Sequence, residues 1–206
     1  MIIPLKQNFD GQLINSSNPL IVTVENFITP GEAEHIVNLA RPKMETATVL
    51  KPEGRIVDDY RTGKVAFLSH NSDPVVADIS QRVAKYVGLP LSHAEDAQIV
   101  HYLKGQAYKP HFDAIVNPSD YDENTLLGGQ RRITALLYLN QVDAGGETYF
   151  PKLGYSHTPE YCSLLMFHNL DEKSNKPEPN SLHGAAPVLS GEKWAMNFWF
   201  RQYARK

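Results

Sequence analysis

Residues that could bind a transition metal occur at two places in this 206-residue sequence. His111 and Asp113 are separated by one residue, and His183 follows much later in the chain. Side chains two residues apart on a β-strand point to the same face, so His111 and Asp113 would lie next to each other. Two histidines and one carboxylate are the set that holds non-haem Fe(II) and leaves coordination positions open for oxygen chemistry. The pattern predicts an oxygenase whose metal ligands are His111, Asp113 and His183.

Lys193 is the second residue with a chemical role in this interpretation. It lies ten residues after His183 and directly before the apolar and aromatic run 194–200. A lysine in such a strand is costly to bury without a partner, so we expect an anionic group near it. In an oxygenase of this kind that anion would be the far carboxylate of 2-oxoglutarate. The alternative is that Lys193 lies at a strand end and points to water.

The other histidines need no metal. His93 and Glu95 form a rival pair of ligands, but Ser92 and Glu95 also have the spacing of a helix capping box, which explains Glu95 without a metal. The sequence places His70 and His157 at turns, where we expect ordinary surface or half-buried side chains. His35 and His168 are expected to be structural, inside a helix and at the end of a strand.

Composition excludes several classes of function. The formal net charge is −3 and no run of lysine or arginine occurs, so a nucleic acid or an anionic membrane is not an expected partner. No long apolar stretch and no signal peptide are present, so no membrane span is expected. The single cysteine, Cys162, cannot form an internal disulfide and fits a reducing compartment. We therefore expect a cytoplasmic protein.

Helices are predicted in the first half of the chain and short strands in the second. Thr29, Pro30 and Glu32 form a capping box that predicts a helix over 30–41, and Asp73-Pro74 predicts a second helix that ends at Gly88. Seven short strands are expected after Pro90, in addition to earlier ones at 21–27 and 65–69: 97–103, 107–113, 131–140, 147–150, 162–168, 183–188 and 193–202.

This order predicts an α+β, mainly β, fold with a double-stranded β-helix (jelly-roll) core and supporting N-terminal helices. The core would span about 95–206 and the helical support about 20–90, within a single catalytic domain over 1–206. Two polar segments, 51–60 and 115–130, could be lids over the site or plain surface excursions. A third, 169–181, is expected to be a solvated loop.

Four blocks of sequence closely resemble the catalytic region of prolyl 4-hydroxylases that act on collagen or on plant and algal cell-wall proteins. The blocks are YLKGQAYKPHFD (102–113), RRITALLYL (131–139), AGGETYFP (144–151) and HGAAPVLSGEKW (183–194). The resemblance covers about residues 20–203. It implies a jelly-roll core that uses Fe(II), 2-oxoglutarate and O₂, with ascorbate as reductant.

The resemblance also implies roles for individual residues. His111, Asp113 and His183 would be the iron ligands, and Lys193 would bind the far carboxylate of 2-oxoglutarate. Thr148 and Tyr102 would assist Lys193, while Tyr108, Arg131 and Trp199 match positions toward the peptide groove. Arg201 departs from the histidine usual in the algal enzymes, which leaves the preferred substrate open. The chain looks like a free-standing microbial or viral form, without the separate peptide-binding domain of the animal enzymes.

The function predicted is therefore hydroxylation of peptidyl proline at C4, coupled to conversion of 2-oxoglutarate into succinate. A proline-containing peptide in the polyproline II conformation suits an open groove, because its backbone is already ordered. Tyr60, Tyr108 and Trp199 would supply aromatic surface for it, although they could equally belong to the core. Other targets of the same chemistry stay open: a lysyl side chain, a ribosomal or elongation-factor proline, or a free amino acid. Outside this chemistry, the alternatives are a metal-binding jelly-roll module without turnover and a cupin-like isomerase.

Overall fold

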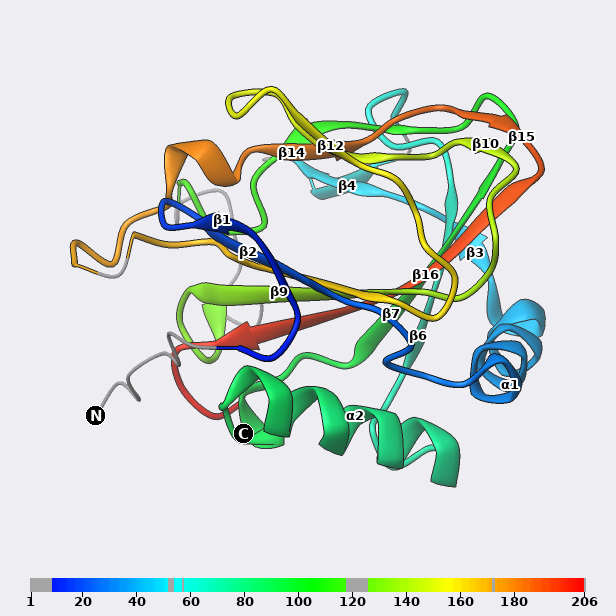
Figure 1. Ribbon diagram of the computed structural model, residues 1–206, viewed down its shortest axis with the longest axis horizontal. Helices are drawn as coiled ribbons and strands as arrows, with labels where there is room; N and C mark the ends of the chain where they lie inside the picture. The colour runs from blue at the N-terminus through cyan, green and yellow to red at the C-terminus, as the bar shows by residue number, and fades with distance from the viewer. Residues whose placement is uncertain (1–8, 52–53, 57, 118–125, 172, 206) are drawn as a thin grey trace.

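Two facing antiparallel sheets and a layer of helices make up the computed structural model, which describes residues 9–51, 54–56, 58–117, 126–171 and 173–205 (Figure 1). The large sheet has eight strands in the order β1 (Gln12–Ser16), β2 (Leu20–Val24), β13 (Leu164–His168), β9 (Arg131–Tyr138), β16 (Glu192–Arg201), β7 (Ala97–Leu103), β6 (Lys64–Leu68) and β3 (Glu45–Thr46). The small sheet has the order β12 (Tyr155–His157), β11 (Thr148–Phe150), β14 (His183–Ala185) and β8 (Tyr108–His111). Two short pairs complete the strands: β10 (Ala144–Gly145) with β15 (Val188–Ser190), and β4 (Val49–Lys51) with β5 (Gly54–Ile56). Two sheets that face each other in this way are the arrangement predicted for a double-stranded β-helix.

The helices begin where the sequence predicts. In α1 (Pro30–Ala40), the backbone N–H of Thr29 donates to the Glu32 carboxylate and the Thr29 hydroxyl accepts from the backbone N–H of Glu32. In α2 (Pro74–Val87), Asp73 accepts from two backbone N–H groups of the first turn, and Gly88 ends the helix in the left-handed conformation. Short 3₁₀ helices among the described residues accompany them: η1 (Arg41–Lys43), η2 (Leu91–His93) and η4 (Pro179–Ser181). Within the described ranges, no helix is long and apolar enough to cross a lipid bilayer.

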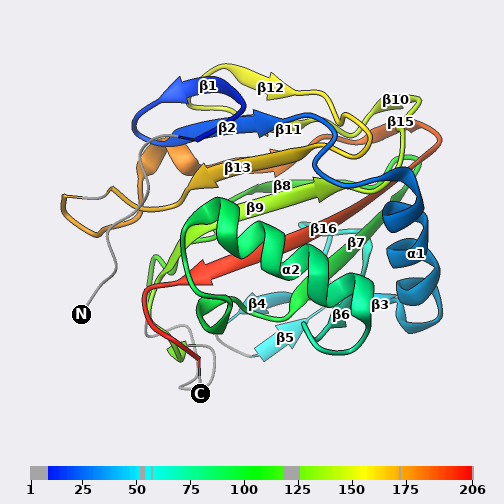
Figure 2. The same cartoon turned by 60° about the horizontal axis from the view of Figure 1, so that its bottom comes forward.

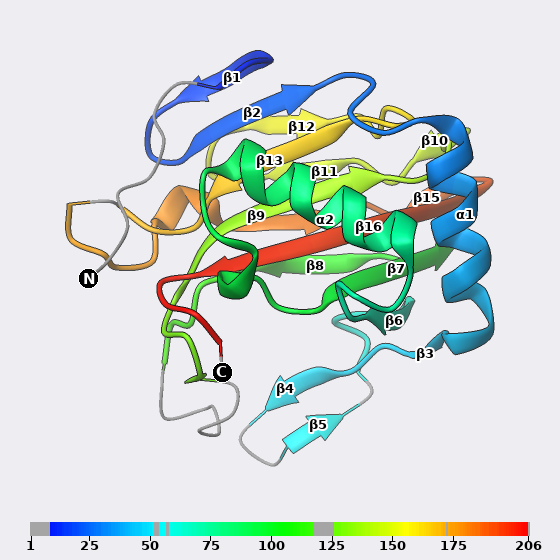
Figure 3. The same ribbon diagram turned by 90° about the horizontal axis from the view of Figure 1, so that it is seen from below.

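The central strands of the large sheet are buried on both faces. The helices cover one face, with α2 lying across β9 and β16 (Figures 2 and 3), and the small sheet lies over the other. Successive residues of β16 accordingly enter different cores: Met196 packs with the helices, whereas Ala195 packs between the two sheets. The unbroken run of buried residues 132–138 in β9 follows from this double burial, because neither face of the strand meets water.

Several predicted boundaries were wrong. The strand expected at 107–113 ends at His111, so Asp113 lies beyond β8 at a bend. The strand expected at 183–188 is divided into β14 and β15, because Ala186 bonds to Glu147 instead of continuing the ladder and Pro187 has no N–H to donate. The segment 51–60 contains β5. Whether this segment is a lid depends partly on residues 52–53 and 57, which lie outside the described residues. In the same way, residues 118–125 of the segment 115–130 lie outside them.

Candidate metal centre

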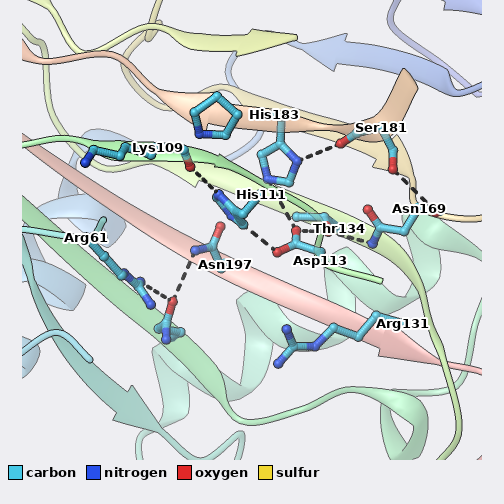
Figure 4. A network of polar contacts seen from close by, with 12 residues as sticks. Arg61, Lys109, His111, Asp113, Arg131, Thr134, Asn169, Ser181, His183 and Asn197 are labelled. Atoms are coloured by element: carbon cyan, nitrogen blue, oxygen red, sulfur yellow. Dashed lines mark hydrogen bonds and ion pairs between the residues drawn. The ribbon is translucent and has the colours of Figure 1, made fainter. Parts of the chain in front are cut away.

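The three predicted metal ligands meet at one end of the space between the sheets. His111 is the last residue of β8, and His183, the first of β14, lies directly opposite it in the antiparallel register. Asp113 follows β8 by two residues and turns its carboxylate under both rings (Figure 4). One ligand atom from each residue lies within 4.8 Å of the others, and no second group of this kind occurs in the part of the chain that the structure describes. The structure thus brings together side chains that are distant in sequence.

Backbone carbonyls set the orientation of both imidazoles. Nδ1 of His111 lies 3.0 Å from the Lys109 carbonyl oxygen, and Nδ1 of His183 lies 2.9 Å from that of Ser181. A carbonyl can only accept, so each Nδ1 carries a proton, and Nε2 of a neutral ring then presents a lone pair. These two Nε2 atoms face Asp113 at 3.7 and 3.5 Å (Figure 4). Three electron-pair donors converge on one point, which is the arrangement that a bound cation stabilises.

The charge states of this cluster suit metal binding. Burial, and then the nearby His183, lower the pKa of His111 to about 3, so its ring is neutral at physiological pH. Burial raises the pKa of Asp113, but its neighbours His183, His111 and Arg131 and the hydrogen bond from Thr134 together lower it below its ordinary value, so the carboxyl group is ionised at physiological pH. Neutral imidazole and ionised carboxylate are the forms that ligate Fe(II).

A second layer of side chains supports the carboxylate, and sequence reasoning missed it. The Thr134 hydroxyl donates to Asp113 at 2.6 Å, and the Asn169 amide donates to the Thr134 oxygen at 2.8 Å. Asn169 belongs to the segment 169–181 that we expected to be a solvated loop. Residues 173–176 of that segment are exposed, but its two ends are buried and hold Asn169 and the carbonyl of Ser181 against the site.

Lys193 lines the same pocket away from the three metal ligands, because Thr134, which donates to Asp113, is paired with Trp199, six residues after Lys193 in β16. We call the buried part of the pocket around Lys193 its closed end. Its side chain is 2 % exposed, so the alternative that it points to water is wrong. Nζ donates to the Gly146 carbonyl oxygen at 2.6 Å, and no carboxylate of a described residue lies within ion-pair distance of it. Burial lowers the pKa of Lys193 from 10.5 to about 7. Glu147 acts on the ammonium group only at longer range, so no described carboxylate is the direct anionic partner that we expected for Lys193.

Eight of the nine predicted site residues line this pocket. They are His111, Asp113, His183, Lys193, Tyr102, Thr148, Tyr108 and Trp199. The Thr148 hydroxyl lies 2.8 Å from that of Tyr138, and the Tyr108 ring stacks on His111 with 3.6 Å between centroids. Tyr60 lies outside the lining and packs edge-on against Tyr108, while its hydroxyl donates to the Pro110 carbonyl.

Arg131 is the predicted site residue that does not line the pocket. Its Nε and Nη2 donate to the two oxygens of Glu95 at 2.5 and 2.8 Å, and its guanidinium lies 4.0 Å from the ring centroid of Trp199. Arg201 donates to the same carboxylate at 2.6 Å. The capping box predicted for Ser92 and Glu95 is therefore wrong, because Glu95 binds two guanidinium groups instead of a helix end.

The rival metal pair has structural roles. His93 is buried, with Nδ1 3.1 Å from the Arg201 carbonyl oxygen.

Arg61, in contrast, is a pocket residue that sequence reasoning missed. Its guanidinium donates to Gln98 at 2.8 Å and lies 4.7 Å from the ring centroid of Tyr108. No local signal marks Arg61, because only the fold brings it to the pocket.

Comparison with known proteins agrees with this site. The sequence model of the 2OG-Fe(II) oxygenase superfamily matches residues 97–201, which contain the metal cluster and Lys193. Prolyl 4-hydroxylase 5 of Arabidopsis thaliana is 35 % identical over 93 % of this chain and 71 % of that protein. A putative prolyl 4-hydroxylase of Acanthamoeba polyphaga mimivirus is 34 % identical over 97 % of this chain and 81 % of its own length.

A solved structure shares the fold. The viral collagen prolyl hydroxylase of Paramecium bursaria Chlorella virus-1, in a 2OG complex, superposes with a TM-score of 0.70 at 24 % identity, over 88 % of this chain and 95 % of that one. The fold and the matched region define a 2-oxoglutarate- and Fe(II)-dependent dioxygenase with a jelly-roll core. Within that superfamily, the chain belongs to the prolyl 4-hydroxylase family.

Proposed function

We propose that this protein hydroxylates proline residues of a peptide or protein at C4, converting 2-oxoglutarate into succinate and CO₂. The observation that carries the proposal is that the two ends of one pocket have opposite chemical character. Three metal-binding groups lie at one end, and the buried Lys193, without a carboxylate partner among the described residues, lies at the other. A cation and a dicarboxylate together satisfy both ends.

His111, Asp113 and His183 would hold the iron through the two Nε2 atoms and the carboxylate. Fe(II), when bound, supplies the activation of O₂ that oxidises both 2-oxoglutarate and an unactivated C–H bond. The protein contributes a prearranged geometry: the Lys109 and Ser181 carbonyls keep each Nδ1 protonated and each Nε2 available. The small, buried pocket also keeps bulk water from the reacting groups.

Lys193, Thr148 and Tyr102 would bind 2-oxoglutarate. The ammonium group neutralises the far carboxylate, and the hydroxyl groups direct hydrogen bonds toward it. Ascorbate is part of the proposal, as reductant, only because of the family to which the chain belongs. A reducing, cytoplasmic location would fit this reductant and the buried free thiol of Cys162.

The mouth of the pocket supports a peptide substrate. Tyr108 and Trp199 provide aromatic surface, and Arg61 provides a buried guanidinium that can donate to a backbone carbonyl. Arg131 would act on the groove through Trp199. The Arg131 guanidinium lies over the Trp199 ring and is itself held by Glu95, so it would keep that ring in position. An extended proline-containing segment presents flat rings and free carbonyls to these groups.

The test is a turnover assay with product analysis. The purified protein would be incubated with Fe(II), 2-oxoglutarate, O₂ and ascorbate, and with polyproline, collagen-like peptides, lysine-containing peptides or free proline. We expect succinate formation to rise with a proline-containing peptide, and the peptide to gain one oxygen atom per succinate, located at C4 by NMR. Oxygen on lysine or on free proline would replace the proposed target by one of the other targets. Absence of succinate with every candidate would favour a binding module.

A further inference from the structure

A histidine that the family resemblance does not assign lies beside the closed end of the pocket. His157 was expected in a turn, but it lies in β12 and is 6 % exposed. In the antiparallel register it is paired directly with Thr148 of β11, so the two side chains are neighbours on the same face of the small sheet. Thr148 lines the pocket, and His157 thus lies just behind the surface that would receive 2-oxoglutarate.

One nitrogen of His157 has a partner and the other does not. Nδ1 lies 3.0 Å from the Tyr155 hydroxyl, whereas Nε2 is buried without a hydrogen-bond partner among the described residues. Burial, and then the positive charge of Lys193, lower the pKa of His157 to about 4, so the ring is neutral at physiological pH. When the Tyr155 hydroxyl donates to Nδ1, the ring proton is on Nε2. A buried N–H donor without an acceptor is then available to a ligand, and leaving it unpaired is destabilising.

The groups around His157 are mostly hydrogen-bond donors. The Tyr138 ring lies at the centre, with Lys193 Nζ 5.4 Å from its centroid and the His157 ring stacked 5.7 Å away. The Tyr138 hydroxyl is in turn bonded to Thr148. Among the residues that the structure describes, no carboxylate forms an ion pair with Lys193 or His157. Glu147 acts on Lys193, and Glu160 on Tyr138, only at longer range. An ammonium group, an imidazole and two hydroxyls without a directly paired carboxylate make an environment for an anion with more than one acceptor atom.

We propose that His157 is a second binding group for the far carboxylate of 2-oxoglutarate, toward which it donates its Nε2–H. The proposal rests on the proposed function and deepens it. Lys193 provides the opposite charge, and His157 provides a directed hydrogen bond to a carboxylate that has two oxygens to satisfy. His157 is therefore a specificity-determining residue: it favours a 2-oxo acid that ends in a carboxylate over one that ends in a methyl group.

Binding measured without turnover tests this assignment. The Fe(II)-loaded protein would be titrated calorimetrically, with O₂ excluded, with 2-oxoglutarate and with 2-oxopentanoate, which has the same chain length but no far carboxylate. We expect His157→Phe, which keeps an aromatic ring against Tyr138 but has no N–H, to weaken binding of 2-oxoglutarate about tenfold (about 1.4 kcal/mol). Binding of 2-oxopentanoate should not change. His157→Gln, which has an amide N–H, should recover most of the lost affinity.

A matched control separates a binding role from a structural one. His70 is a half-buried histidine that stacks on Phe198 in the core below the helices, with its Nδ1 2.9 Å from the Ser80 hydroxyl. His70→Phe should alter the thermal unfolding temperature without changing either affinity. If His157→Phe does not fold, His157→Val in the same strand replaces it.

The outcomes are distinguishable from failure of the proposed function. Unchanged affinity for 2-oxoglutarate in a folded His157→Phe, or equal losses for both 2-oxo acids, would overturn the role of His157. Lack of 2-oxoglutarate binding by the unaltered protein would overturn the proposed function itself.

Discussion

The two ends of the pocket have opposite chemistry. At the metal end, His111, Asp113 and His183 direct electron pairs at one point. At the closed end, the Lys193 ammonium group donates to the Gly146 carbonyl, and the neighbouring His157 has a buried Nε2 without a partner among the described residues. Each end by itself has an unbalanced set of polar groups, which costs stability in a buried site. The comparison indicates that the pocket is built for two ligands of opposite charge, a cation at one end and a carboxylate at the other.

The largest expected effect is at the metal end. Asp113→Asn replaces the anionic ligand by a neutral amide, so we expect Fe(II) affinity to fall on the order of a hundredfold or more, with loss of turnover. The fold should survive, because an amide can still accept from Thr134. Metal titration followed by calorimetry or by tryptophan fluorescence would measure the change. Affinity for Fe(II) equal to that of the unaltered protein would show that the metal is held elsewhere.

The next effect belongs to the closed end. Lys193→Met keeps the length of the side chain and removes the charge, so we expect affinity for 2-oxoglutarate to fall roughly a hundredfold, in line with about 3 kcal/mol for loss of one partner of a buried ion pair. Fe(II) affinity should stay unchanged. The ligand-free variant should be at least as stable as the parent in thermal unfolding, since a buried ammonium group has been replaced by an apolar one. Simultaneous loss of Fe(II) binding would contradict the separation of the two ends.

The pH dependence of cosubstrate binding sharpens the comparison further. The pKa of Lys193 is about 7 in the ligand-free protein, and a bound carboxylate would raise it. Binding should therefore take up a proton above pH 7, and affinity for 2-oxoglutarate should fall by up to about tenfold per pH unit in that range. Calorimetry in buffers of different ionisation enthalpy would measure the proton uptake, which Lys193→Met should abolish.

The lowered pKa of Lys193 also affects stability, and this effect has the opposite dependence on pH to that of 2-oxoglutarate binding. The pKa of Lys193 is lower in the folded protein than the ordinary value of 10.5, so between about pH 7 and 10.5 the unfolded chain binds more protons than the folded one. The contribution of Lys193 to the free energy of unfolding therefore rises with pH across this window and is least favourable below pH 7. Unfolding of the ligand-free protein and of Lys193→Met at several pH values would separate this contribution, and parallel curves for the two proteins would contradict it.

Local signals predicted the helices and the metal cluster well. Both helix starts depend on residues within one turn, so Thr29 and Asp73 were sufficient to locate them. The spacing of His111 and Asp113 alone is a weak signal. The metal ligands were visible because a distal histidine and Lys193 follow, within blocks whose order resembles a known family. The mainly β architecture followed from strand composition, while the division into one domain over 1–206 stays a prediction.

Interactions distant in sequence account for what the sequence did not reveal. Glu95 has the spacing of a helix cap, yet it binds Arg131 and Arg201, which are brought to it by other strands. Short strands such as β12 exist only through pairing with β11, so His157 was placed in a turn. Asparagine and threonine are common residues, so nothing in the sequence distinguishes Asn169 and Thr134, and only the fold reveals their hydrogen bonds.

The smallest effects are expected from two threonines that allow a crossed test of the two ends. Thr134 donates to Asp113 at the metal end, and Thr148 lines the closed end beside Tyr138. Substitution by valine removes one hydroxyl from each and nearly preserves the shape of the side chain. Thr134→Val should lower Fe(II) affinity about tenfold, in line with loss of a hydrogen bond to a metal ligand, and leave 2-oxoglutarate binding to the iron-saturated protein unchanged.

Thr148→Val should show the reverse: Fe(II) affinity is retained, and affinity for 2-oxoglutarate falls severalfold because one hydrogen bond to a charged group is lost. Both affinities would be measured by calorimetry without O₂, and thermal unfolding would establish that each variant is folded. If either valine variant lowered both affinities to the same extent, the two ends would act as one cooperative unit. The pocket would then not consist of two independent sites of opposite charge.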